Sequence, residues 1–362
     1  DIVLTIDRAI QYEACAKIEE AVRRFEAKSA TVIIMDPYTG AIMAMCSAPD
    51  FDPANVGRIK AVSVLNNPAI FYQYEPGSIF KPLTLAAGID AGKIMPDTTY
   101  TDTGLEIIDN FPIRNSDKEA HGVQTMKDVL DKSLNTGTIF VERLLGRESF
   151  RQYMKDFGLG EKTGIELKSE VAADIDSLDR KGKVFAATAS FGQGITTTPL
   201  QMVAAYAELG NGGMLMKPHI VSEIIHPDGR HDVIKPEAMR QVIKPQTSRL
   251  ISAMMVDVVE HGHGKRAAVP GYYVAGKTGT AQVPDPNGRG YLKDETIGSF
   301  AGFAPADHPA FVMLVKIDHP RTVQFAESSA GPIFGELSAF LLSYLQVPPE
   351  RPIRIPPPAP AL

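Results

Sequence analysis

The stretch EPGSIFKPLT, residues 75–84, places a serine and a lysine three positions apart, behind a Pro-Gly turn and before an apolar run. Proline is tolerated close to a helix N-terminus, so Pro82 favours a helix that begins near Ser78. Residues i and i+3 share one helical face, which sets the Ser78 hydroxyl beside the Lys81 amine. A base next to a hydroxyl makes the oxygen nucleophilic. Because Ser-x-x-Lys also arises by chance, the rest of the sequence must separate a reactive pair from an ordinary helix start.

Length and composition describe a globular protein and exclude several classes. With 362 residues, 44% of them hydrophobic, the chain can form one large domain or two of medium size. The net charge is −6 and basic residues are interspersed with acidic ones, so no nucleic-acid partner is expected. The two cysteines, Cys15 and Cys46, are too few for a disulfide framework and lack metal-ligand spacing, which favours two buried thiols.

No segment of the sequence predicts a membrane span. The apolar runs are far too short to cross a bilayer, and the opening DIVLTID has neither an initiator methionine nor a signal peptide. These features fit either a cytosolic protein or a soluble piece of a longer one.

The two ends of the chain carry patterns typical of one shared sheet. β-rich runs separated by turn residues occur near both ends, and apolar residues recur at helical spacing beside them. The expected elements are a helix over residues 8–27, a hairpin over 31–47 that turns at 36–40, strands over 299–306 and 310–318, and a last helix over 332–344. We therefore expect strands from both termini to meet in one sheet.

The middle of the chain is mostly helical in pattern. Its clearest helix is TPLQMVAAYAELGNGG, with Thr198 as N-cap, Pro199 in the first position, Gln201 closing a capping box and Gly210 past the end. The predicted fold class is α/β (α+β), with a central antiparallel sheet covered by helices and an all-helical subdomain.

These patterns also define the expected domain boundaries. One domain spans residues 1–346, with its sheet drawn from about 1–60 and 265–346 and its helical subdomain over about 61–264. The end VPPERPIRIPPPAPAL, residues 347–362, is proline-rich and lacks a core-forming pattern, so an extended or disordered tail is expected.

Two further polar motifs follow the serine-lysine pair. DKSLNTG contains Ser133 and Asn135, and VAGKTGTAQV contains Lys277 to Thr280. Ser-x-x-Lys, Ser-x-Asn and Lys-Thr-Gly, in this order, are typical of penicillin-binding proteins and class A β-lactamases. Three motifs in order are far more specific than any one of them, and they favour the reactive pair over the ordinary helix start.

The chain resembles the transpeptidase domain of class B, monofunctional penicillin-binding proteins, and the resemblance covers nearly all of it. DIVLTIDRAIQ, DPYTGAIMAM, FGQGITTTPLQM and SFAGFAPADHP fit that family as well as the three motifs do. EPGS before Ser78 and KTGTAQ from Lys277 resemble the division (septal) branch more than the elongation branch. Ile79 and Phe80 depart from the small residues that the family more often has there. The resemblance implies the penicillin-binding and serine β-lactamase fold.

The chemistry of such a site assigns roles to four residues. An alkyl alcohol is a weak nucleophile, so Ser78 needs a neutral amine nearby. Lys81 can supply it only if burial and a second cation lower its pKa, and Lys277 is the obvious second cation. The positive end of the helix favours an attacking alkoxide. Ser133 is expected to bridge the two lysines and pass a proton to the departing amine.

The remaining motif residues are expected to hold the substrate. The Asn135 amide would bind the substrate's peptide backbone. The KTG motif is expected on an edge strand, where a peptide can pair alongside it and where Gly279 has no side chain to keep the peptide away. The resemblance implies that Thr278 and Thr280, with Lys277, bind the terminal carboxylate. It also implies an oxyanion hole made by the N–H groups of Ser78 and Thr280.

Two rival interpretations are weaker. GYYVAGKT, residues 271–278, fits a Walker A motif, but Lys277 is followed by β-like residues and turn formers where a phosphate loop needs a helix. His261 and His263 lie in a glycine-rich stretch without a cysteine partner, so an exposed loop is expected there, and His121 is expected near the cleft without a chemical role. No metal or cofactor is implied.

The function implied by the resemblance is that of a peptidoglycan D,D-transpeptidase. Ser78 would form an acyl-enzyme with a stem peptide, and β-lactams would acylate the same serine. No Glu-x-x-x-Asn pattern of the class A β-lactamases follows Asn135, but a D,D-carboxypeptidase or a β-lactam-binding sensor remains an alternative. The implied setting is the periplasmic face of the inner membrane, with a membrane anchor outside this sequence and divisome membrane proteins as partners.

Overall fold

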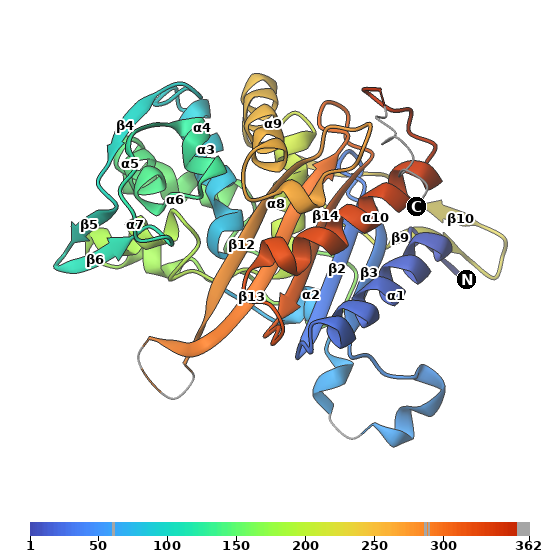
Figure 1. Ribbon diagram of the computed structural model, residues 1–362. Helices are drawn as coiled ribbons and strands as arrows, with labels where there is room; N and C mark the ends of the chain where they lie inside the picture. The colour runs from blue at the N-terminus through green and yellow to red at the C-terminus, as the bar shows by residue number, and fades with distance from the viewer. Residues whose placement is uncertain (60–61, 286–287, 289, 353–362) are drawn as a thin grey trace, which may run out of the picture.

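The computed structural model describes residues 1–352 apart from 60–61, 286–287 and 289, and a five-stranded antiparallel sheet lies at its centre (Figure 1). The strand order is β12-β13-β14-β2-β3, so β12 is an edge strand. The strands are β2 (Ser29–Met35), β3 (Ile42–Ala48), β12 (Ala275–Pro284), β13 (Tyr291–Ala304) and β14 (Phe311–Asp318). Because β14 pairs with β2, the two ends of the chain share one sheet, as predicted.

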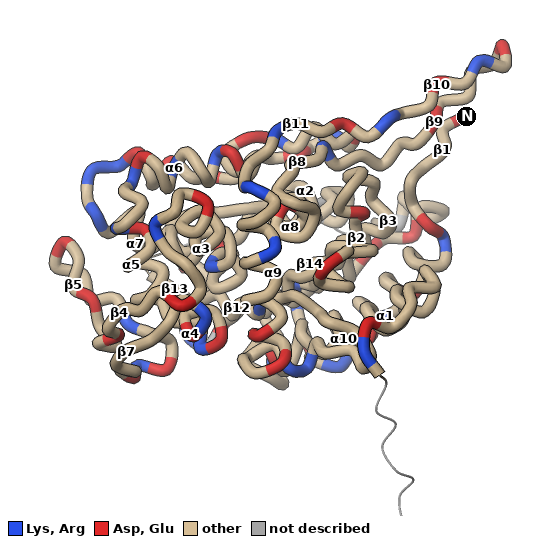
Figure 2. Tube along the Cα trace, turned by 90° about the horizontal axis from the view of Figure 1, so that it is seen from above, with Lys and Arg blue, Asp and Glu red and all other residues tan. Residues whose placement is uncertain are grey.

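The sheet is buried on both faces by helices. Figures 1 and 2 show α1 (Arg8–Arg24) and α10 (Ala330–Tyr344) on one face, and α8 (Pro199–Gly210) on the other. Successive side chains of a strand point to opposite faces. Val32 and Ile34 of β2 therefore pack in the same core as α1 and α10, whereas Ile33 and Met35 pack in the core that contains α8. This double burial explains the unbroken apolar run VIIM.

The predicted helices are present, with shifted ends. Helix α1 stops at Arg24, three residues short of the prediction, because Phe25 caps it and Glu26 adopts a φ of 47°. The capping box of Thr198 and Gln201 at the start of α8 is confirmed, but Gly210 is the last residue of the helix and not its cap. Helix α10 begins two residues before the predicted Pro332.

The middle of the chain contains more than helices, so the prediction of an all-helical subdomain is wrong. Its helices are α2 (Pro68–Phe71), α3 (Lys81–Asp90), α4 (Met126–Asp131), α5 (Asn135–Leu145), α6 (Arg147–Asp156), α7 (Lys183–Ala189), α8 and α9 (Pro245–Glu260). Among them lie two antiparallel pairs, β4 (Thr99–Asp102) with β7 (Gly122–Thr125) and β5 (Leu105–Ile108) with β6 (Phe111–Arg114). The β5–β6 turn is made by Asp109 and Asn110, both at positive φ, which is a hairpin signal that the helical reading overlooked.

Smaller sheets complete the fold. Strand β1 (Ile2–Leu4) pairs with β9 (Val221–Ile225), which also pairs with β10 (His231–Val233). Strand β8 (Met214–Met216) pairs with β11 (Ala238–Gln241).

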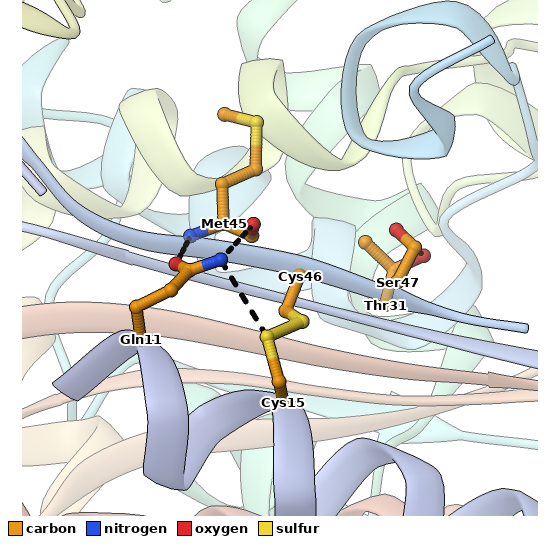
Figure 3. The surroundings of a disulfide bond; sticks show 6 residues. All are labelled: Gln11, Cys15, Thr31, Met45, Cys46 and Ser47. Carbon is orange, nitrogen blue, oxygen red and sulfur yellow. Dashed lines mark hydrogen bonds between the residues drawn. A yellow bond between two sulfur atoms is a disulfide. The ribbon is translucent and has the colours of Figure 1, made fainter. Parts of the chain in front are cut away.

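The two cysteines form a disulfide, which corrects the prediction of two thiols (Figure 3). Cys15 lies on α1 and Cys46 on β3, and their Cα atoms are 5.4 Å apart. Gln11 holds the two elements together beside the bridge: its Nε2 donates to Met45 O at 3.0 Å and its Oε1 accepts from Met45 N at 2.9 Å. Two cysteines are too few for several disulfides, but they can form one. A single disulfide requires only that α1 and β3 cross where Cys15 and Cys46 lie.

The predicted tail begins in contact with the body of the protein. Glu350 N donates to Gly271 O at 2.9 Å, and the Arg351 guanidinium pairs with Glu260 at 2.7 Å. The rest of the predicted tail, residues 353–362, lies outside the described residues. Within the described part of the chain, no helix combines the length and apolar character that a bilayer span requires.

Candidate active site

The first motif lies on a tight turn that leads into α3. A 3₁₀ turn (Gly77–Phe80) precedes the helix, and the N–H of Lys81 donates to the Ser78 carbonyl. Residues i and i+3 eclipse one another in a 3₁₀ turn, so the Ser78 and Lys81 side chains share one face, as predicted. Pro82 occupies the first turn of α3, where no intrahelical donor is lost. Ser78 is half-buried, whereas Lys81 is fully buried.

Residues outside the motif hold this turn in place. Gly77 N donates to Gly192 O at 3.0 Å, and a Cβ on Gly192 would lie only 2.3 Å from Gly77 O. The Tyr206 hydroxyl, from α8, donates to Ile79 O at 2.6 Å. The FGQG stretch was noted in the sequence as a family feature, but its packing against the serine turn was not foreseen.

Glu75 is a second supporting residue that the sequence reasoning missed. Its carboxylate accepts from Gly194 N at 3.0 Å and from the Tyr291 hydroxyl at 3.0 Å, so it ties the FGQG stretch and β13 to the serine turn. Burial raises the pKa of the Glu75 carboxyl, and these two hydrogen bonds oppose the rise. The only feature of the sequence that indicated this role is the position of Glu75 directly before Pro-Gly-Ser.

The second motif meets the first through Lys81. The Lys81 Nζ donates to the Ser133 carbonyl at 2.5 Å and to the Ser133 hydroxyl at 3.2 Å. Ser133 adopts a φ of 57°, and Asn135 starts helix α5. Both Ser133 and Asn135 are half-buried. The structure thus brings Ser133 to one of the two lysines that it was predicted to bridge.

The third motif lies on the edge strand, as predicted. Lys277, Thr278, Gly279 and Thr280 are consecutive residues of β12. A Cβ on Gly279 would lie 2.9 Å from Ile79 Cγ2 and 3.1 Å from Pro76 O. Gly279 therefore lets the strand approach the serine turn, a reason that differs from the predicted one of admitting a substrate peptide.

The hydrogen bonds of β12 leave donors for an incoming group. The Lys277 Nζ donates to Thr278 O at 3.1 Å. The Thr280 hydroxyl oxygen accepts from Ala326 N at 3.0 Å, and its proton remains available to a further acceptor. Thr280 is half-buried, Thr278 is 7% exposed and Lys277 is fully buried, so Thr280 is the most accessible of these three side chains.

The two lysines are an unusual electrostatic feature, because both are 0% exposed. Burial lowers the pKa of Lys81 well below its ordinary value, and the nearby Lys277 charge lowers it further, while Asp117 opposes both effects. Burial lowers the pKa of Lys277 to about 7, against the opposing charges of Asp131 and Glu327. The surroundings of Lys81 thus favour its uncharged form.

The rival interpretations of the sequence receive no support. Lys277 lies inside a ten-residue strand, so no helix follows it to bind phosphates. His261 pairs with Asp257 at 2.7 Å and His263 with Glu327 at 3.2 Å, which gives the two histidines separate partners. His121 pairs with Asp117 at 2.8 Å.

The fold and the three converging motifs define a class of protein. A partly exposed serine three residues before a buried lysine, with a second buried lysine on the edge strand of an antiparallel sheet, is the arrangement of the penicillin-binding protein and serine β-lactamase fold. Such an arrangement can activate a hydroxyl for acyl transfer without a metal ion.

The chain belongs to the penicillin-binding protein transpeptidase family, because the family described as "Penicillin binding protein transpeptidase domain" matches residues 30–339. The chain is 39% identical over 356 residues to stage V sporulation protein D of Bacillus subtilis. This alignment covers 97% of the chain and 55% of that protein. It is 31% identical over 355 residues to the probable peptidoglycan D,D-transpeptidase PenA of Neisseria flavescens. That alignment covers 98% of the chain and 85% of the relative. The chain spans about half the length of the first of these relatives.

Solved structures agree with the family assignment. Penicillin binding protein 3 from Mycobacterium tuberculosis, complexed with ampicillin, matches with a TM-score of 0.91 and 31% identity, over 98% of this chain and 80% of that chain. Apart from the all-helical subdomain, the predicted fold class is confirmed, as is the predicted resemblance to a class B, division-type transpeptidase domain.

Proposed function

We propose that this domain is a serine D,D-transpeptidase that cross-links peptidoglycan stem peptides. The observation that carries the proposal is the complete burial of Lys81 at the point where its Nζ meets Ser133 and where Lys277 adds a second positive charge. In this reaction Ser78 attacks the carbonyl between two D-alanines, the last D-alanine leaves, and an amine of a neighbouring stem peptide takes the acyl group.

Each proton in the acylation step has a carrier. The neutral Lys81 amine takes the proton of Ser78 Oγ as the oxygen bonds to the carbonyl carbon. The Ser133 hydroxyl, which accepts from Lys81 Nζ at 3.2 Å, then passes its proton to the nitrogen of the departing D-alanine and takes a proton from the Lys81 ammonium, so both groups return to their starting states. The N–H groups of Ser78 and Thr280 stabilise the negative oxygen, and losing one such donor costs about 3 kcal/mol of barrier.

Substrate binding falls to the edge strand and to α5. Lys277, with the hydroxyls of Thr278 and Thr280, pairs with the terminal carboxylate of the donor peptide. The Asn135 amide binds the donor's backbone, and Gly279 keeps the strand close enough to the Ser78 turn for both contacts. β-Lactams, whose carboxylate and amide mimic the donor's end, acylate Ser78 in the same way.

The names of relatives support the substrate and the inhibitor class. One relative is named a probable peptidoglycan D,D-transpeptidase, another an FtsI homolog, and structural neighbours carry ampicillin or aztreonam. We infer a role in cell-wall synthesis at division, with divisome membrane proteins as partners; the sporulation protein among the relatives marks spore formation as the competing setting.

The disulfide supports a place outside the cytoplasm. Disulfides persist in the periplasm and other oxidising compartments and are rare in the cytosol. The Cys15–Cys46 bridge therefore fits a domain on the periplasmic face of the membrane, where peptidoglycan is assembled.

Labelling with a fluorescent penicillin tests the proposal. The protein should take up one label, the label should map to the peptide that contains Ser78, and Ser78→Ala should take up none. A D-Ala-D-Ala stem peptide with an added amine acceptor should then yield free D-alanine and an amide-linked product. Labelling that persists in Ser78→Ala would refute the nucleophile, and transfer only to water would identify a D,D-carboxypeptidase instead.

A further inference from the structure

We propose that Asp102 and Asn115 form a positioning pair that sets Asn135 in place for substrate binding. Neither residue belongs to the three motifs. Asp102 is the last residue of β4 and Asn115 directly follows β6, so both come from the strand pairs that the helical reading overlooked. Each is only 2% exposed. The inference rests on the proposed function, in which the Asn135 amide binds the donor peptide.

Helix α5 needs an external cap, and Asn115 supplies it. The residue before the helix, Leu134, has no side-chain oxygen, and the first N–H groups of a helix lack intrahelical partners. Asn115 Oδ1 accepts from Asn135 N at 2.9 Å and from Thr136 N at 3.2 Å. Asn115 lies 20 positions before Asn135 in the chain and nevertheless acts as the N-cap of α5.

Asp102 fixes which way the Asn115 amide faces. Asn115 Nδ2 donates to Asp102 Oδ1 at 3.1 Å and to Oδ2 at 2.9 Å. The reversed amide would set an NH₂ group against the helix N–H groups and an oxygen against the carboxylate, so only one orientation satisfies both sides. The carboxylate is itself held by the Thr136 hydroxyl at 2.7 Å and by the N–H groups of Gly104 and His121.

The charge on Asp102 is stable in this setting. Burial raises the pKa of its carboxyl, but the hydrogen bonds from Gly104, Thr136, Asn115 and His121 outweigh burial and lower the pKa overall. Asp102 therefore stays ionised at neutral pH and keeps accepting from the Asn115 amide nitrogen, which also donates to Glu119 O at 3.4 Å.

The same strand end also orients the Asn135 side chain. Asn135 Nδ2 donates to Arg114 O at 2.8 Å, so Arg114 and Asn115 hold the side chain and the backbone of Asn135 together. Losing the cap would let the first turn of α5 fray, and Asn135 would leave the position that the donor peptide needs. A misplacement of about 1 Å at a catalytic site can cost a hundredfold in rate.

A double-mutant cycle tests the proposal, with the second-order rate of acylation by a fluorescent penicillin as the readout. We expect Asn115→Ala to lower this rate by about tenfold to a hundredfold. The matched control is Asn211→Ala, because Asn211 Oδ1 also accepts two backbone N–H groups, those of Gly213 and Met214. Its amide nitrogen donates to Pro37 O and Met214 O, so these contacts lie outside the three motifs. The control should stay within about threefold of the unmodified protein.

The second arm separates positioning from general destabilisation. If Asn115 acts through Asn135, then Asn115→Ala should change the rate by less than about threefold in an Asn135→Ala background. An equal loss in both backgrounds, or an unchanged rate in Asn115→Ala alone, would overturn the proposal. Should Asn115→Ala fail to fold, Asp102→Asn must still lower the rate about tenfold in protein whose thermal unfolding remains cooperative. An unchanged rate in that variant would also overturn the proposal.

Failure of the positioning pair can be distinguished from failure of the proposed function. If the unmodified protein takes no label at Ser78, the proposed function is refuted. Amide hydrogen exchange at Asn135 and Thr136 then still tests the pair, because their N–H groups should exchange at least about tenfold faster in Asn115→Ala than in Asn211→Ala. Equal exchange in both variants would refute the cap.

Discussion

Replacing Lys277 with methionine is expected to stabilise the folded protein while it abolishes acylation. Burial lowers the pKa of Lys277 to about 7 from 10.5, so the folded state binds fewer protons than the unfolded chain between these two values. Folding therefore expels a proton from Lys277, and the free energy of unfolding is reduced wherever the unfolded lysine is charged. Methionine has nearly the same length and no charge to expel.

The size of the effect follows from the two pKa values. At pH 7 the proton expelled from Lys277 costs about 4 kcal/mol of stability, and at pH 9 about 2 kcal/mol. The cost disappears as the pH approaches the ordinary pKa of lysine. The gain from Lys277→Met should therefore be greatest at and below about pH 7 and should shrink as the pH rises toward the ordinary pKa of lysine.

Urea unfolding of both proteins at pH 7 and pH 9 measures this gain. The matched control is Lys93→Met, because Lys93 is exposed beyond the end of α3 and its replacement should change stability by less than about 0.5 kcal/mol. The reasoning is refuted if Lys277→Met is less stable than the unmodified protein at pH 7, or if its gain is the same at both pH values.

Three further predictions concern the charge of Lys277, the close packing at Gly279 and the disulfide. The rate of acylation should fall as the pH rises through about 7, since Lys277 then loses the charge that binds the substrate carboxylate, and Lys277→Arg should show a lower rate without this fall, as a pH series of penicillin labelling would reveal. Gly279→Ala should lower the labelling rate at least about a hundredfold, because its Cβ would lie 2.9 Å from Ile79 Cγ2; labelling at the normal rate would contradict that close approach. Paired replacement of Cys15 and Cys46 by serine should lower the free energy of unfolding by about 3 to 4 kcal/mol for a 31-residue separation, and a urea midpoint equal to that of the oxidised protein would argue against the bridge.

The sequence was informative where function depends on local spacing. Ser78 and Lys81 are three residues apart on one turn, and a turn of that kind is specified by Pro-Gly before it and by Pro82 within it. The terminal strands were predictable for a similar reason, because their apolar runs are long and their turns are marked by proline or glycine.

The parts that escaped prediction depend on contacts between distant segments. The disulfide requires α1 to cross β3 at Cys15 and Cys46, and nothing near either cysteine signals that crossing. Asn115 caps a helix that begins 20 residues later, so it lacks the adjacency by which N-caps are recognised in a sequence.

Gly279 lies between the features that local spacing predicts and those that depend on distant contacts. The sequence singled out the residue, but its reason emerged only from the Ile79 side chain packed against it. A motif can thus identify a position correctly while the neighbour that constrains it comes from another part of the chain.

The most direct test of the account is the ionisation state of Lys81, measured by NMR on protein labelled with ¹³C at the lysine Cε and assigned with Lys81→Arg. We expect the Lys81 amine to be uncharged at pH 7, because burial and the Lys277 charge both lower its pKa, and we expect that pKa to rise in Lys277→Met. A Lys81 resonance that reports a charged ammonium at pH 7 and does not respond to Lys277→Met would show that Lys81 is not the base that activates Ser78.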